Sequence, residues 1–168
     1  TKHFSSLTPK ELLAHFEDKY SSLKEILPHL NQLNNPLKNP FKCELFNGIE
    51  WLKIVLKDFI KAKANYKIIG IREEYEHILG YFVEQGIIKL NHFNVKEEAL
   101  IEEGYHIKKL KNSTHKTLPK GTLSDFTTLL YKNTVLFINW KEPYTIIRIE
   151  NSNFYQSQLD QFTLLWKK

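Results

Sequence analysis

Several residue types are scarce or missing in this 168-residue chain. It contains no methionine, one cysteine and six glycines, and no apolar run is long enough to span a membrane. The single Cys43 cannot form a disulfide within the chain or hold zinc by itself, so we expect a protein of the reducing cytoplasm with no membrane partner. Because the chain begins at Thr1 and lacks methionine, we expect it to be a piece of a longer protein.

The sequence also lacks the short patterns that mark common catalytic and metal sites. There is no Gly-rich phosphate loop, no Gly-x-Ser-x-Gly elbow and no His-Glu-x-x-His pair. The seven histidines are scattered, and His106 and His115, which flank one stretch of loop, are expected to be exposed. We therefore predict no catalytic residue, no metal ion and no cofactor.

What is present is the composition of an ordinary globular domain. The chain is 42% hydrophobic and 26% charged, and a chain of this length can bury a core without cross-links. Its net charge is +5, but the lysines are spread along the chain rather than massed in one block. Such a distribution is typical of a solvated surface, and it leaves direct binding of nucleic acid as an alternative function.

The first element is a long amphipathic helix, predicted over residues 8–34. Thr8 and Glu11 form a capping box around Pro9, which suits the first helical position. Apolar residues then recur at steps of three and four, and Pro28 should kink the helix or end its first part. The apolar stripe can pack on its own domain or join two chains. The residues predicted to form a homodimer interface are Phe16, Tyr20, Leu23, Leu27 and Leu30.

The middle of the chain alternates between strand and helix patterns. Strands are predicted at 41–46, 66–71 and 87–93, and helices at 49–62 and 73–85, with Gly86 ending the second helix. Residues 94–104 are acidic and expected to be partly helical, 105–110 are a short strand candidate, and 111–121 are expected to form a loop. Strands that alternate with helices favour parallel pairing through right-handed crossovers.

The last part of the chain predicts three strands and a closing helix. The strands are expected at 126–131, 134–140 and 144–149, the first two joined as a hairpin at Lys132-Asn133. Asn151-Ser152-Asn153 offers several N-cap candidates for a helix that ends near Trp166. Together these patterns predict an α/β domain over 41–168, with a mixed sheet flanked by helices and preceded by the long amphipathic helix.

Several stretches resemble a known family. Ile149-Glu150-Asn151, followed by a helix with Phe162 and Trp166, is similar to the end of the effector domain of TrmB-type transcriptional regulators. The stretch 7–33, with its Leu27-Pro28-His29-Leu30 step, resembles the linker helix of that family. Phe46, Gly48, Ile49 and Glu50 resemble the start of its phospholipase-D-like effector domain. The resemblance covers nearly the whole chain.

The resemblance implies a phospholipase-D-like fold and a non-catalytic domain of a transcriptional regulator that binds an effector and dimerises. The partners it implies are a second copy of the chain and a small-molecule effector. No winged helix-turn-helix pattern precedes Thr8, so the resemblance implies DNA contact only through a domain outside this chain.

A phosphodiesterase or nuclease of the phospholipase D type is the rival interpretation. Such enzymes use a His-x-Lys-x-x-x-x-Asp pattern twice, with one histidine as nucleophile and the other as acid. This chain has one His-x-Lys, at His106 and Lys108, and Ser113 stands where the aspartate belongs. Because no second copy exists, we predict no catalysis.

One anion site is predicted at the end of a strand. Gly70-Ile71-Arg72 follows a strand and precedes a helix, a position that faces the ligand crevice in open α/β sheets. Arg72 is therefore a candidate ligand-binding residue, although an exposed arginine at a strand end is the simpler interpretation. If strand 87–93 runs parallel to strand 66–71, His92 and Asn94 complete the site.

Overall fold

The computed structural model describes residues 8–33 and 39–167, without the side chains of residues 29–33. The chain divides into two units, Thr1–Lys38 and Asn39–Lys168, which are described separately. The first contains one described element, α1 (Pro9–Leu33), and Pro28 lies inside this helix without ending it. The predicted capping box is present, because the Thr8 backbone N–H donates to Glu11 at 2.8 Å and the Glu11 N–H donates to the Thr8 hydroxyl.

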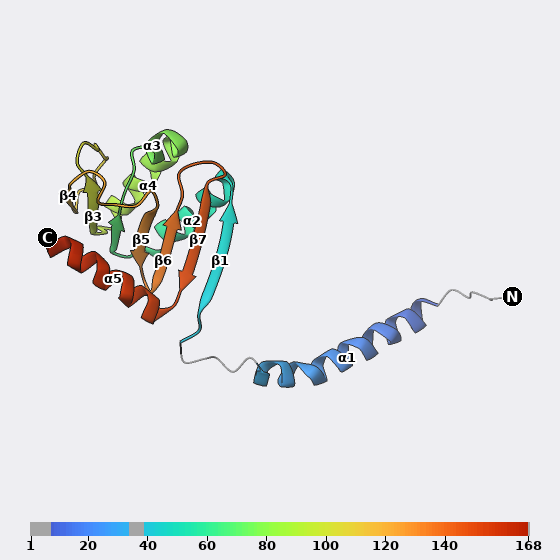
Figure 1. Ribbon diagram of the computed structural model, residues 1–168. Coiled ribbons are helices and arrows are strands. Elements are labelled where there is room, and N and C mark those ends of the chain that lie inside the picture. Colours follow the sequence, from blue (N-terminus) through green and yellow to red (C-terminus); the bar gives the residue numbers. More distant parts are fainter. Residues whose placement is uncertain (1–7, 34–38, 168) are drawn as a thin grey trace. The chain divides into compact units, whose positions relative to one another are not determined.

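The second unit is built on a seven-stranded mixed sheet with the order β1-β7-β6-β5-β2-β3-β4 (Figure 1). Its elements are β1 (Lys42–Asn47), α2 (Ile49–Ala62), β2 (Tyr66–Ile69), α3 (Glu74–Leu79), α4 (Tyr81–His92), β3 (Glu97–Glu102), β4 (Ser113–Leu118), β5 (Thr127–Tyr131), β6 (Thr134–Ile138), β7 (Thr145–Glu150) and α5 (Ser152–Lys167). Strands β2, β3 and β4 pair in parallel, and the other neighbours pair antiparallel. The predicted α/β fold class is confirmed.

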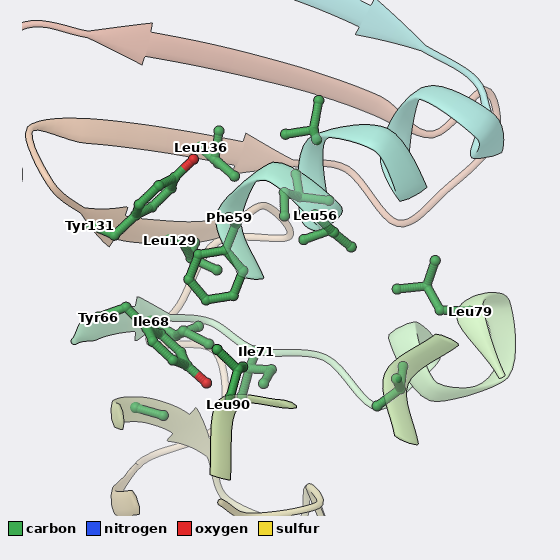
Figure 2. Packing of buried hydrophobic residues seen from close by; sticks show 14 of the residues in the cluster. Leu56, Phe59, Tyr66, Ile68, Ile71, Leu79, Leu90, Leu129, Tyr131 and Leu136 are labelled. Carbon is green, nitrogen blue, oxygen red and sulfur yellow. The ribbon is translucent and has the colours of Figure 1, made fainter. Parts of the chain in front are cut away.

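The sheet carries an apolar core on each face. Helices α2, α3 and α4 cover one face and α5 lies on the other (Figure 1). On the first face the Phe59 ring stands between two tyrosines, 4.8 Å from the Tyr66 ring and 5.1 Å from the Tyr131 ring, both edge-on (Figure 2). On the second face Phe162 is fully buried against Leu100, Leu118, Leu130 and Val135. The sheet, with β2 and β3 among its interior strands, thus lies between two helical layers.

The predicted hairpin and closing helix are confirmed, the first at its turn residues and the second at its N-cap. Lys132 and Asn133 link β5 to β6 with positive φ values of 41° and 62°, the backbone that a tight two-residue hairpin turn requires. The Asn151 side-chain oxygen accepts the Phe154 N–H at 2.9 Å, which caps the first turn of α5.

The prediction of a strand at 87–93 is wrong, because α4 continues through Gly86 to His92. Val83, Gly86 and Leu90 are buried at helical spacing, and α4 packs against α2. A Cβ on Gly86 would stand 3.2 Å from the Ile60 Cδ1 atom, so the missing side chain allows α2 and α4 to pack closely. Gly86 thus serves helix packing rather than helix termination.

The predictions for 94–121 are wrong as well. Residues 97–102 form the interior strand β3 rather than a helix, 105–110 form no strand, and Ser113–Leu118 form the edge strand β4 instead of a loop. The acidic residues of β3 are compatible with a buried strand because each has a partner. Glu98 pairs with Lys67, and Glu102 accepts the Leu123 N–H at 2.8 Å.

Among the described helices, none combines the length and the apolar character needed to cross a bilayer. The most extended helix, α1, carries charged residues along its length.

Candidate functional site

Arg72 follows β2 at the carboxyl edge of the sheet, as predicted, but its guanidinium is already engaged within the protein. Nη1 donates to the Tyr105 hydroxyl at 2.6 Å, and Nη2 donates to the Ser124 carbonyl at 2.9 Å and to Asp125 Oδ1 at 3.1 Å. The Arg72 side chain is only 14% exposed. Arg72 therefore ties two loops to the end of β2, and an added anion would compete with Asp125.

The loop that carries Asp125 is fixed by further polar contacts. Lys141 Nζ donates to Asp125 Oδ2 at 3.1 Å, and this bond, with the charges of Lys141 and Arg72, lowers the pKa of the Asp125 carboxyl. The Thr127 hydroxyl donates to the Gly70 carbonyl at 2.7 Å and accepts the Trp140 indole N–H at 2.8 Å. The carboxyl edge of β2 is thus closed by the protein's own side chains.

The structure does not bring His92 and Asn94 to Arg72. His92 is the last residue of α4, and Asn94 precedes the amino end of β3. Because β2 and β3 are parallel, with Tyr66 opposite Glu97, these residues lie at the edge of the sheet opposite to Arg72. The predicted three-residue site is not assembled.

A buried polar array on the helical face was missed by the sequence analysis. Glu97 accepts the Tyr66 hydroxyl on Oε2 at 2.5 Å, and its Oε1 lies 2.7 Å from His115 Nε2. Burial, reinforced by the Glu97 charge, raises the pKa of the Tyr66 hydroxyl well above its usual range, so Tyr66 stays a donor. The His115 side chain is 2% exposed, which corrects the expectation that it lies in solvent.

The register of the strands explains how the array forms. Tyr66 lies opposite Glu97, and Ala99 lies opposite His115, so three adjacent parallel strands point these side chains to the same face. The sequence feature that could have indicated the array is Glu97, which lies on the same strand face as the buried residues Ala99 and Ile101. A carboxylate in such a row needs buried donors, but only the pairing of β3 with β4 identifies His115 as one of them.

Two spaces flank this array. An inner cavity of about 110 Å³ lies between the sheet and α2–α4; it is lined mainly by apolar side chains, with Tyr66, Tyr75 and Glu97 among its polar ones. An outer hollow is lined by Glu76, Ile101, His115 and the segment Tyr105–Lys109. Segment Tyr105–Lys109 is held by side-chain acceptors: the His106 N–H donates to Glu73 and the Lys108 N–H donates to Glu76.

The single His-x-Lys pattern lies on this segment, outside any strand. The His106 side chain is 96% exposed, and Lys108 Nζ lies 3.3 Å from Glu84 and 3.6 Å from Glu76. The Ser113 hydroxyl donates to the Leu110 carbonyl rather than to either residue. Among residues 8–33 and 39–167, no cluster of three or more histidines, cysteines or carboxylates is arranged to hold a metal ion.

The predicted dimer stripe lies on α1. Phe16, Tyr20, Leu23 and Leu27 are exposed by 61%, 69%, 63% and 44%, whereas the Leu30 side chain is outside the described residues. A single helix cannot bury its own apolar stripe, so these residues remain candidates for an interface.

The fold is shared with solved structures, although no protein-family model and no curated protein matches the sequence. TrmBL2, described as an archaeal chromatin protein whose structure shows a novel mode of DNA binding, has a TM-score of 0.54 and 16% identity; the match covers 95% of this chain and 64% of TrmBL2. The phospholipase-D-like protein NucT from Helicobacter pylori has a TM-score of 0.55 and 11% identity, over 76% of this chain and 97% of NucT. Polyphosphate kinase from Porphyromonas gingivalis has a TM-score of 0.52 and 11% identity, over 76% of this chain and 26% of the kinase. At these identities the likeness shows a phospholipase-D-like fold.

Proposed function

We propose that the chain is the non-catalytic effector-binding and dimerisation domain of a TrmB-like transcriptional regulator. The observation that carries the proposal is the extent of the match with TrmBL2. The sheet unit, Asn39–Lys168, makes up about three quarters of the chain, so the 76% covered by NucT corresponds in size to that unit alone. The 95% covered by TrmBL2 can be reached only by including much of Thr1–Lys38.

Dimerisation is the part of the proposal that can be measured most directly. We expect the chain to sediment as a dimer over a concentration series in the micromolar range, since the α1 stripe needs a covering surface. A monomer at the highest concentration would overturn the assignment of α1 as a dimer helix.

The non-catalytic part of the proposal is supported by the surroundings of His106. A phospholipase-D-type reaction needs one histidine to attack and a second to protonate the leaving group. His106 is exposed with its neighbour Lys108 paired to two carboxylates, and His115 is tied to Glu97.

We expect no hydrolysis of phosphodiester model substrates or single-stranded DNA by the chain. The control is a His106→Ala variant assayed beside it at equal concentration. Hydrolysis by the wild type that is lost in this variant would favour the enzyme interpretation.

Effector binding is proposed for the helical face of the sheet. Tyr66 and Glu97 line the inner cavity and His115 lines the outer hollow, so each space has a member of the buried polar array in its wall. Clefts that combine apolar walls with a few fixed polar atoms are typical of small-molecule sites.

A further inference from the structure

His115 Nδ1 is a buried polar atom with no hydrogen-bond partner in the described part of the chain. Buried polar atoms in folded proteins are nearly always hydrogen-bonded, and an exception points to a ligand, an ordered water or a chemical role. The other ring nitrogen, Nε2, is held by Glu97 at 2.7 Å, so the ring cannot turn to satisfy Nδ1 without breaking that contact.

Glu97 determines which nitrogen of His115 carries the hydrogen. An ionised carboxylate only accepts hydrogen bonds, and Glu97 already accepts one from Tyr66, so the Nε2 atom beside it carries an N–H. Nδ1 is then an acceptor in the neutral ring and a donor in the imidazolium. A partner for Nδ1 has to come from the side of the ring away from Glu97.

The outer hollow, which His115 lines, has one lysine on its rim that no carboxylate neutralises. Lys108 on this rim is paired with Glu76 and Glu84, whereas Lys109 is exposed with no acidic partner among the described residues. The one carboxylate in the lining, Glu76, already accepts the Lys108 N–H at 3.0 Å and the Tyr75 hydroxyl at 3.3 Å. An unpaired lysine at the rim of a hollow favours an anionic ligand there.

We propose that the outer hollow binds the phosphate group of a small-molecule effector, with His115 Nδ1 as its buried contact and Lys109 as its charged one. The inference rests on the proposed effector-binding function and adds the chemical class of the effector. A phosphate monoanion carries both P–OH donors and P–O acceptors, so it can pair with Nδ1 in either form of the ring. An ionised carboxylate has no donor, so it could bond to Nδ1 only when the His115 ring is an imidazolium.

The ligand can reach Nδ1 only if the segment Tyr105–Lys109 yields, because the atom itself has no surface open to water. This segment has no strand partner and is held by the Glu73 and Glu76 side chains. Hydrogen bonds from the backbone of a loop to side-chain carboxylates open more easily than a strand ladder. Binding should therefore slow hydrogen exchange at the His106 and Lys108 amides.

The test is a titration of the full chain with inorganic phosphate, followed through the imidazole ¹⁵N resonances. We expect the His115 Nδ1 resonance to shift in a saturable way at millimolar phosphate, with little response to acetate. A parallel titration with a nucleoside monophosphate separates a free-phosphate site from one that binds phosphomonoesters. No saturable shift with either phosphate probe would overturn the proposal.

The matched variant is His115→Gln, whose side-chain amide can still donate to Glu97 but has no atom in the place of Nδ1. We expect it to fold and to lose at least tenfold in phosphate affinity. Lys109→Gln, on an exposed residue, should weaken binding several-fold even if His115→Gln fails to fold. Lys132→Gln, on the hairpin turn, should bind like the wild type.

Wild-type affinity in Lys109→Gln and in a folded His115→Gln would overturn the site. If the chain is a dimer that does not bind phosphate, only the phosphate site is contradicted. If it is a monomer that binds phosphate, only the assignment of α1 as a dimer helix is contradicted.

Discussion

Arg72 shows what a residue-scale prediction could and could not reach. The strand-to-helix position of Gly70-Ile71-Arg72 placed the side chain at the carboxyl edge of the sheet correctly. Its partners Tyr105 and Asp125 come from loops 33 and 53 residues away in sequence, and no local pattern indicates them. An arginine with three internal acceptors at this edge stabilises the fold, a role that the strand pattern alone cannot separate from ligand binding.

We expect Arg72→Gln to lower the free energy of unfolding by about 2 kcal/mol, because charged hydrogen bonds to two loops are lost and their partners are left behind. Urea denaturation at neutral pH measures this. Lys141→Gln is the control: its side chain is 76% exposed and should matter little. Equal, small effects for both variants would show that Arg72 is not a structural tie.

The contacts of Asp125 with Lys141 and Arg72 also make the stability of the protein depend on pH. The pKa of Asp125 is lowered by Lys141 first and Arg72 second, so its contribution to stability is present at neutral pH and is lost as the pH falls through the lowered pKa. The fall in stability between neutral pH and pH values below the ordinary aspartate range should therefore be smaller in Arg72→Gln than in the wild type.

At the scale of the elements, the sequence predicts those that begin or end at a local turn or cap residue. It does not predict those whose conformation depends on the elements packed against them. The hairpin turn and the cap at Thr8 are local chemistry that the sequence predicts, and the Asn151 cap is one of the three candidates that it offers. The run 87–93 has strand-like composition, yet it completes α4 because Gly86 permits packing against Ile60. Strand β3 was missed because its glutamates look exposed until Tyr66, His115, Lys67 and the Leu123 N–H are known to meet them.

Asn133 tests the hairpin turn. Its φ of 62° lies in the left-handed region, where a β-branched side chain costs about 1–2 kcal/mol, so Asn133→Val should lower the free energy of unfolding by roughly that amount. Thermal and urea denaturation report the change. Asn133→Gly, which tolerates the same φ, is the matched control and should cost much less. A loss of the same size in both variants would place the cause in the Asn133 side chain rather than in the backbone.

At the scale of the whole molecule, α1 has apolar residues and no described surface of its own unit to cover them. We propose that two copies of the chain pair along Phe16, Tyr20, Leu23 and Leu27, since a two-fold interface buries the same stripe twice. Leu23→Asp then places a charge in both halves of one interface. Burying an unpaired carboxylate costs several kcal/mol, so the dimer should weaken by at least about 100-fold.

Ser21→Asp is the matched control for this substitution. It adds the same charge two residues away, on the side of the helix turned away from the stripe, because successive residues are about 100° apart. Sedimentation over a concentration series should show the dimer kept in Ser21→Asp and lost in Leu23→Asp, with unchanged circular dichroism in both. If both variants dimerise like the wild type, the interface does not use the α1 stripe. The exposed edge strand β1, whose Leu45 is 62% exposed and whose outer backbone edge has no neighbouring strand in the seven-stranded sheet, would then be the next surface to mutate.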